Sequence, residues 1–132
     1  MPILTVTGVR GTIIESARPD WRLEPSVVEE IRTHGATGVV CVNDLVALQL
    51  WSVAEAAGLR IPEDLSLTGV DNSPEAELRG LTSVNFGYEE VGYLAVEAWV
   101  QRMAGASAAA CSRVVPVYLH ERRSVAPPSI RS

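Results

Sequence analysis

The sequence has 132 residues, of which 47% are hydrophobic and 20% charged, and these proportions are typical of one ordinary globular domain. The chain has 16 acidic and 11 basic residues, the latter all arginine, so its formal net charge is -5. Direct binding to nucleic-acid phosphates normally needs a basic surface, so this charge balance argues against nucleic-acid binding. The first residues lack a secretion signal and no apolar stretch approaches the roughly 20 residues that span a bilayer, so we expect a cytoplasmic protein.

The first third of the chain contains two extended segments, a helix and a strand. The extended segments are 3–7 and 11–15. A helix is predicted from Pro25 to Gly35, because proline is common at a first helical position and glycine commonly ends a helix. Residues 38–42 form a continuous apolar run, which is typical of a strand covered on both faces in a parallel sheet. The isolated Cys41 within this run is expected to be reduced and buried.

A long helix is predicted from Asn43-Asp44 to Gly58. Either polar side chain at its start can cap the first turn. One apolar stripe at helical spacing contains Val46, Leu50, Val53 and Ala57. Further apolar residues lie off that stripe, namely Leu45, Leu48 and Trp51. A helix that is apolar around so much of its circumference is either packed on two sides or used in a subunit contact.

The second half of the chain continues the alternation of strands and helices. A strand over 65–70 ends at Asp71-Asn72, and a short helix runs from Ser73 to Gly80. An extended segment (81–85), a long helix (88–103), a loop (104–112) and a final strand (114–122) follow. Because Pro116 cannot donate to a strand ladder, it favours the start of this strand or a sheet edge.

This order predicts an α/β fold with a mostly parallel, doubly wound sheet. Ligands of such sheets bind at the carboxyl ends of the strands, where the pairs Asn43-Asp44 and Asp71-Asn72 stand. Their donors and acceptors suit the hydroxyls of a sugar or the edge of a base. The alternative is that the first pair only caps a helix and the second only shapes a turn. Since Ser73 is available as the next cap, we favour a binding role for Asp71.

No set of catalytic residues emerges. His34 and His120 have no recognisable nucleophile or metal partner, and no glycine-rich phosphate loop occurs. We therefore expect no enzymatic activity, no metal and no cofactor. Trp21 follows Asp20 in a loop, where it can stack on a sugar face or fold onto the core.

Four segments resemble the LacI/GalR family of transcriptional repressors. Residues 40–48 resemble that family's AND-x-x-A-x-G segment, and residues 57–72 resemble its GLRVPEDVSVVGFDD/N stretch. Residues 81–84 resemble LTTV, and residues 119–124 resemble the closing ERRS or VRES strand. The match covers roughly residues 37–128, and the GLRVPEDVS block is its specific part.

The resemblance implies an incomplete periplasmic-binding-protein-like (type I) lobe that binds a small effector, usually a sugar and in a known variant a purine. The ligand-binding residues that it implies are Asp71, Asn43, Trp21, Asp20 and Asn72. It also implies a homodimer, with an interface that includes Leu45, Leu48, Trp51, Ser52 and Arg79.

The resemblance also divides the chain. Residues 1–84 would form a segment like the C-terminal lobe, and 85–112 a crossover helix and loop belonging to the N-terminal lobe. Residues 113–126 would be the return strand and 127–132 a flexible tail. The family's helix-turn-helix module, hinge helix and most of its N-terminal lobe are not matched, so we expect contact with DNA only through a module missing here. Residues 85–87 also replace the Gln-Pro that usually follows LTTV.

The sequence thus predicts the effector-sensing fragment of a LacI-type repressor. One alternative is a solute-binding protein of a sugar transporter, which shares the lobe architecture and would need an export signal. The other is a small α/β enzyme that uses Asp44 or Asp71 as a general acid or base.

Overall fold

The computed structural model describes residues 3–6, 9–12, 14 and 22–128. Its elements in chain order are β1 (Ile3–Val6), β2 (Val9–Thr12), α1 (Val27–Thr33), β3 (Gly38–Val40), α2 (Asp44–Ala56), β4 (Ser66–Val70), α3 (Pro74–Arg79), β5 (Thr82–Asn85), α4 (Tyr88–Met103), the 3₁₀ turn η1 (Ala109–Cys111) and β6 (Tyr118–His120). The final strand is shorter than expected and begins after Pro116, and the loop expected over 104–112 contains η1.

Four strands form the main sheet in the order β3-β4-β5-β6. The pairs β3–β4 and β4–β5 are parallel and β5–β6 is antiparallel, which confirms the mostly parallel sheet. β1 and β2 form a separate antiparallel pair. Parallel neighbours need crossover connections, and α2 and α3 supply them. The carboxyl ends of β3, β4 and β5 therefore meet at one edge of the sheet.

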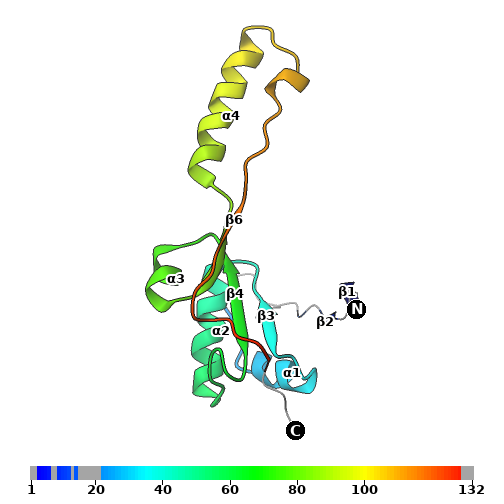
Figure 1. The fold of residues 1–132 in the computed structure, drawn as a ribbon, viewed down its shortest axis with the longest axis vertical. Coiled ribbons are helices and arrows are strands. Elements are labelled where there is room, and N and C mark those ends of the chain that lie inside the picture. Colours follow the sequence, from blue (N-terminus) through cyan, green and yellow to red (C-terminus); the bar gives the residue numbers. More distant parts are fainter. Residues whose placement is uncertain (1–2, 7–8, 13, 15–21, 129–132) are drawn as a thin grey trace.

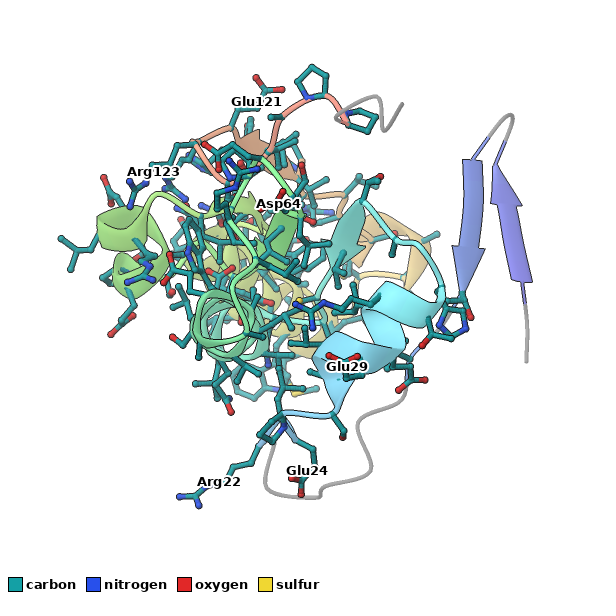
Figure 2. The ribbon with its side chains drawn as sticks, turned by 90° about the horizontal axis from the view of Figure 1, so that it is seen from below. Arg22, Glu24, Glu29, Asp64, Glu121 and Arg123 are labelled. Atoms are coloured by element: carbon teal, nitrogen blue, oxygen red, sulfur yellow. The ribbon has the colours of Figure 1, made fainter. Side chains whose placement is uncertain are left out.

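One hydrophobic core packs α1, α2 and α3 against the sheet. Both overall views show α2 lying between α1 and α3 (Figures 1 and 2). The buried members of this core are Ile31, Cys41, Ala47, Leu50, Trp51, Leu65, Leu67, Ala76 and Leu81. Burial of this apolar area on one side of the helices accounts for the packing.

The outer face of β3 is bare within the described part of the chain. Val39 is half-buried and packs against the core, whereas Val40 is 82% exposed. Successive side chains of a strand point to opposite faces, so helices on one face leave every second residue in solvent. The prediction that strand 38–42 is covered on both faces is therefore wrong for these residues.

The buried stripe of α2 also differs from the prediction. The buried apolar residues of this helix are Ala47, Leu50, Trp51 and Ala54. They stand three, four and seven positions apart and so share one helix face. Trp51, expected off the stripe, is only 2% exposed. A tryptophan buries more apolar area than a valine, which explains why the helix turns this face toward the sheet.

The segment before the C-terminus is tied to the sheet by Ser124, which is fully buried. Its hydroxyl donates to the carbonyl of Leu67 at 2.6 Å and accepts from the N–H of Thr82 at 2.8 Å. Its own carbonyl accepts from the N–H of Leu67 at 2.8 Å. One serine thus bridges β4 and β5, which gives the end of the segment 119–124 a structural role.

Helix α4 projects from the sheet body, and the returning chain runs back beside it (Figure 1). None of its residues is buried, and large apolar side chains such as Tyr93 (72% exposed) and Trp99 (62% exposed) face solvent. No helix of the described residues is long and apolar enough to cross a membrane. The assignment of 85–112 to a second lobe stays a prediction.

Candidate functional site

A buried carboxylate lies behind the strand ends. Asp44, the first residue of α2, is 1% exposed. Its Oδ2 accepts from the N–H of Ser73 at 2.7 Å, and its Oδ1 accepts from the Ser83 hydroxyl at 2.6 Å. That hydroxyl accepts in turn from the N–H of Asn72 at 3.0 Å. Asp44 therefore joins the regions that follow β3 and β4 to β5, and both of its oxygens are engaged in structural hydrogen bonds.

Two helix caps stand at the same edge. The Asn43 side chain accepts from the N–H of Val46 at 2.9 Å and so caps α2. The Ser73 hydroxyl accepts from the N–H of Ala76 at 3.2 Å and caps α3, as expected. The cap of α2 uses the amide oxygen of Asn43, so a ligand contact by Asn43 would fall to its amide nitrogen.

The end of β4 has an unusual backbone. Asp71 has a φ of +110° and Asn72 a φ of +54°, and both are residues other than glycine. The N–H of Asp71 donates to the carbonyl of Val84 at 2.9 Å, and the Arg122 guanidinium donates to Asn72 Oδ1 at 2.7 Å. Such conformations persist only where the surroundings fix them, and they gather at functional sites. These hydrogen bonds hold the backbone at the end of β4, while Asp71 itself is exposed.

Tyr88 is the residue of this edge that the sequence reasoning missed. Its hydroxyl donates to Asp71 Oδ1 at 2.9 Å, and this bond raises the pKa of Tyr88 above its ordinary value. Its ring meets that of Phe86 edge-on, with centroids 6.0 Å apart. The order of the parallel strands could have indicated this contact, because the chain that follows β5 emerges beside the end of β4.

The arrangement offers a carboxylate, two amide side chains, a phenol and an aromatic face at one edge of a parallel sheet. Asp71, Asn72 and Asn43 thus lie at the predicted edge, while Asp20 and Trp21 fall outside the described residues. Exposed carboxylate oxygens accept hydrogen bonds from hydroxyl groups. The chemistry suits a small polar ligand with several hydroxyls.

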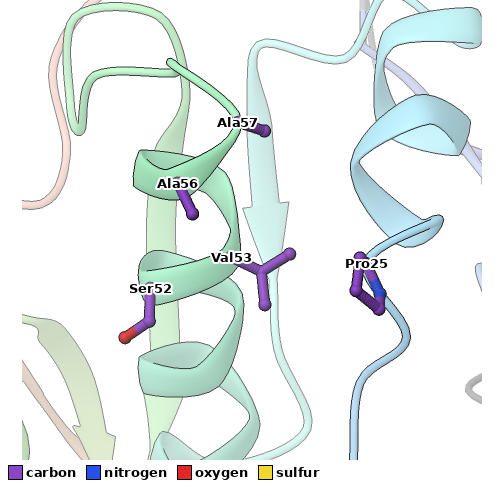
Figure 3. Close-up of a pocket in the computed structure, with 5 residues that line it drawn as sticks. All are labelled: Pro25, Ser52, Val53, Ala56 and Ala57. Carbon is purple, nitrogen blue, oxygen red and sulfur yellow. The ribbon is translucent and has the colours of Figure 1, made fainter.

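The open depression shown in Figure 3 has other chemistry. Its volume is about 360 Å³ and its lining residues are Pro25, Ser52, Val53, Ala56 and Ala57. That volume is within the range of small-molecule sites, but the lining side chains carry a single polar group, the Ser52 hydroxyl. It also lies toward the C-terminal end of α2, whereas the strand ends meet the start of this helix.

A second open depression, also of about 360 Å³, lies between α2 and α3. It is lined by Leu48, Ser52, Glu75, Leu78 and Arg79, three of which are predicted interface residues. The nearby Leu45 is 58% exposed. These residues form one apolar surface with a charged margin.

Trp51 lies beneath this surface. The Arg79 guanidinium stands 5.1 Å and that of Arg123 5.8 Å from its ring centroid. Its indole N–H donates to Glu55 at 2.8 Å, and Glu55 also pairs with Arg79. Contrary to the expectation, Trp51 is covered by its own chain and cannot contact a second subunit directly.

The remaining candidates are structural. Cys41 is a free, buried cysteine, as expected. Its burial, and to a smaller extent the negative charge of Asp44, raise the pKa of its thiol to about 12. The Nδ1 of His34 donates a hydrogen bond to the Glu30 carbonyl at 2.8 Å. Among the residues with described placement, no group of three His, Cys, Asp or Glu side chains could hold a metal ion.

Comparisons with known proteins agree with this geometry. A family model described as the periplasmic binding protein-like domain matches residues 4–125. The HTH-type transcriptional repressor PurR of Escherichia fergusonii is 33% identical over 97 residues, which cover 72% of this chain and 28% of that protein. The chain therefore spans less than a third of the length of this relative.

Solved structures show the same relationship. The chain superposes on a LacI-family transcriptional regulatory protein from Corynebacterium glutamicum with a TM-score of 0.63 and 30% identity, covering 78% of this chain and 40% of that one. It superposes on a LacI family transcriptional regulator from Enterococcus faecium with bound ribose with a TM-score of 0.66 and 30% identity, covering 78% and 39%.

Proposed function

The chain belongs to the periplasmic binding protein-like domain family, and we propose that it forms the effector-binding part of a LacI-type transcriptional regulator. The observation that carries the proposal is the Asp71 carboxylate, which is exposed at the end of β4 on a backbone held at positive φ. Ligands of open parallel sheets bind at this edge.

The proposed effector is a sugar-like molecule. Asp71 would accept hydrogen bonds from its hydroxyls, and the amide groups of Asn43 and Asn72 would add donors and acceptors. A structural relative contains bound ribose, which supports this class. Asp20 and Trp21 stay part of the proposed site, and a purine is the alternative ligand.

The proposed regulator is a homodimer. The surface between α2 and α3 would form the contact through Leu45, Leu48, Ser52 and Arg79. Apolar side chains at the centre and charges at the margin are the usual composition of such an interface. Contact with DNA would be made by another module, since the net charge of -5 disfavours phosphate binding by these 132 residues.

Calorimetric titration with D-ribose tests the ligand proposal. We expect Asp71→Ala to weaken binding at least about tenfold, because a hydrogen-bonded charged group is removed. Glu63→Ala, which removes an exposed carboxylate from a turn elsewhere, should leave the affinity unchanged. Binding of hypoxanthine in place of ribose would correct the ligand class, and unaltered ribose binding by Asp71→Ala would contradict the site.

Sedimentation equilibrium tests the dimer proposal. Leu48→Glu places a charge in the α2–α3 depression and should shift the protein to monomers. Val40→Glu introduces the same charge on the bare face of β3 and should leave the dimer intact. A monomeric unaltered chain, or equal effects of the two variants, would reject this interface.

A further inference from the structure

The carboxylate of Asp71 already has a hydrogen-bond donor in this structure. The hydroxyl of Tyr88 donates to Asp71 Oδ1 at 2.9 Å. Both side chains are exposed, Tyr88 to 56%, so small molecules can reach the bond. A phenol and an alcohol are donors of the same kind. The Tyr88 hydroxyl therefore occupies a position at which a ligand hydroxyl would bind.

The two partners of this bond belong to different parts of the molecule. Asp71 is fixed to the sheet body through its N–H, which donates to the Val84 carbonyl at 2.9 Å. Tyr88 is the first residue of α4, which projects from that body and has no buried residue (Figure 1). The bond thus joins the base of the exposed helix to the strand end.

The chain connects these two parts through Gly87, which can serve as a hinge for α4. Gly87 precedes Tyr88 with a φ of +63°, and a Cβ there would stand 3.2 Å from Cγ1 of Val115 on the returning chain. Glycine accepts this conformation without steric cost. Since no residue of α4 is buried, the side-chain bond at its base is one of the contacts that orient the helix.

We infer that Tyr88 competes with the ligand for Asp71, so that a ligand with two neighbouring hydroxyls displaces the Tyr88 hydroxyl and frees the base of α4. Two neighbouring hydroxyls can bind both carboxylate oxygens side by side, and the one on Oδ1 then approaches from the side that Tyr88 occupies, whereas a single donor can use Oδ2 alone. The ligand class rests on the proposed function, whereas the orienting role of the bond does not.

The competition has a reciprocal consequence. A ligand that must break a hydrogen bond binds more weakly by the free energy of that bond. Removal of the Tyr88 hydroxyl should therefore strengthen binding and loosen α4. A residue that only contacts the ligand would give the opposite result, because its removal weakens binding.

Tyr88→Phe in the 132-residue chain tests the inference, because it removes the hydroxyl and keeps the ring that meets Phe86. Tyr93→Phe is the matched control, since it removes an exposed hydroxyl from the same helix. Without ligand, hydrogen exchange of the α4 amides should be faster in Tyr88→Phe and unchanged in Tyr93→Phe. Equal exchange in all three proteins would overturn the orienting role.

Titration with D-ribose forms the second part of the test. We expect the dissociation constant to fall about two- to fivefold in Tyr88→Phe, because the lost bond is solvent-exposed and modest. Ribose should also speed exchange of α4 in the unaltered chain but not in Tyr88→Phe. Ribose binding with equal affinity to both would leave the proposed function intact and overturn the competition. Ribose binding to neither would refute the proposed sugar site, and with it the competition, while the first part still decides the role of the bond.

Discussion

The carboxylate of Asp44 lies where a side chain of residue 69 would stand. A Cβ on Gly69 would be 2.2 Å from Asp44 Oδ1 and 3.1 Å from Leu81 Cδ2. Glycine weakens a strand, and its presence often marks the close approach of another group. Here Gly69 leaves space for the buried Asp44 carboxylate, which accepts hydrogen bonds from the Ser73 N–H and the Ser83 hydroxyl. The edge that carries the candidate site therefore depends on an absent side chain two residues before Asp71.

Gly69→Ala should destabilise the fold strongly. The added methyl group must displace Asp44 from its hydrogen bonds, and we expect a loss of about 3 kcal/mol in the free energy of unfolding. Urea denaturation followed by circular dichroism measures this loss. Gly38→Ala is the matched control, because its Cβ would lie 3.7 Å from Ser66 Cβ, and its effect should stay within about 1 kcal/mol. Equal losses in the two variants would contradict the role of Gly69.

Asp71→Gly and Asp71→Ala separate backbone strain from ligand binding. Both variants lack the carboxylate, so both should lose ribose binding. Only glycine adopts a φ of +110° without strain, so the glycine variant should be the more stable by about 1 kcal/mol. Denaturation curves of the pair measure the difference. If the alanine variant proves as stable, the unusual conformation stores no strain.

The ionisation of Tyr88 should respond to Asp71. The hydrogen bond, desolvation and the charge of the carboxylate raise the pKa of Tyr88 above the ordinary value of 10.0. The stabilising bond is thus present below pH 10 and is lost as the pH rises through the higher folded-state pKa. Difference titration of tyrosinate absorbance, with Tyr88→Phe as the reference, should show a lower pKa in Asp71→Asn. An unchanged pKa would indicate that the two groups do not interact in solution.

Cys41 should resist modification in the folded protein. Its thiol has a pKa of about 12 and its side chain is buried, so the reactive thiolate is scarce and covered at pH 8. A thiol reagent should modify only the half-buried Cys111 under native conditions and both cysteines in urea. Cys111→Ser then isolates Cys41, and its rapid native labelling would disagree with the described core.

The predictable part of this fold follows from local patterns. Apolar runs bounded by turn residues placed β3 and β4 near their observed bounds, and Ser73 was identified as an available cap. The alternation of strands and helices predicted the parallel sheet, which placed Asp71 and Asn72 at its carboxyl edge. These features depend on backbone propensity and on residues close in sequence.

The features that differ from the sequence-based predictions depend on long-range packing. The face of α2 that is buried was misjudged, because hydrophobicity alone does not say which stripe of an apolar helix meets the sheet. The covering of β3 on both faces was also wrong, since an apolar strand sequence does not specify how many layers surround it. The hydrogen bond between Tyr88 and Asp71 joins residues 17 positions apart on separate elements and had no local sign.

The sequence by itself determined the alternating elements, the polar strand ends and the family motifs, because each is encoded in neighbouring residues. The tertiary structure decided that Asp44 is a buried structural group and Asp71 an exposed one. The physical reason is the parallel sheet, which brings three strand ends together and leaves room over Gly69 for the Asp44 carboxylate. The same packing places Tyr88 against Asp71 and so joins α4 to the proposed binding edge.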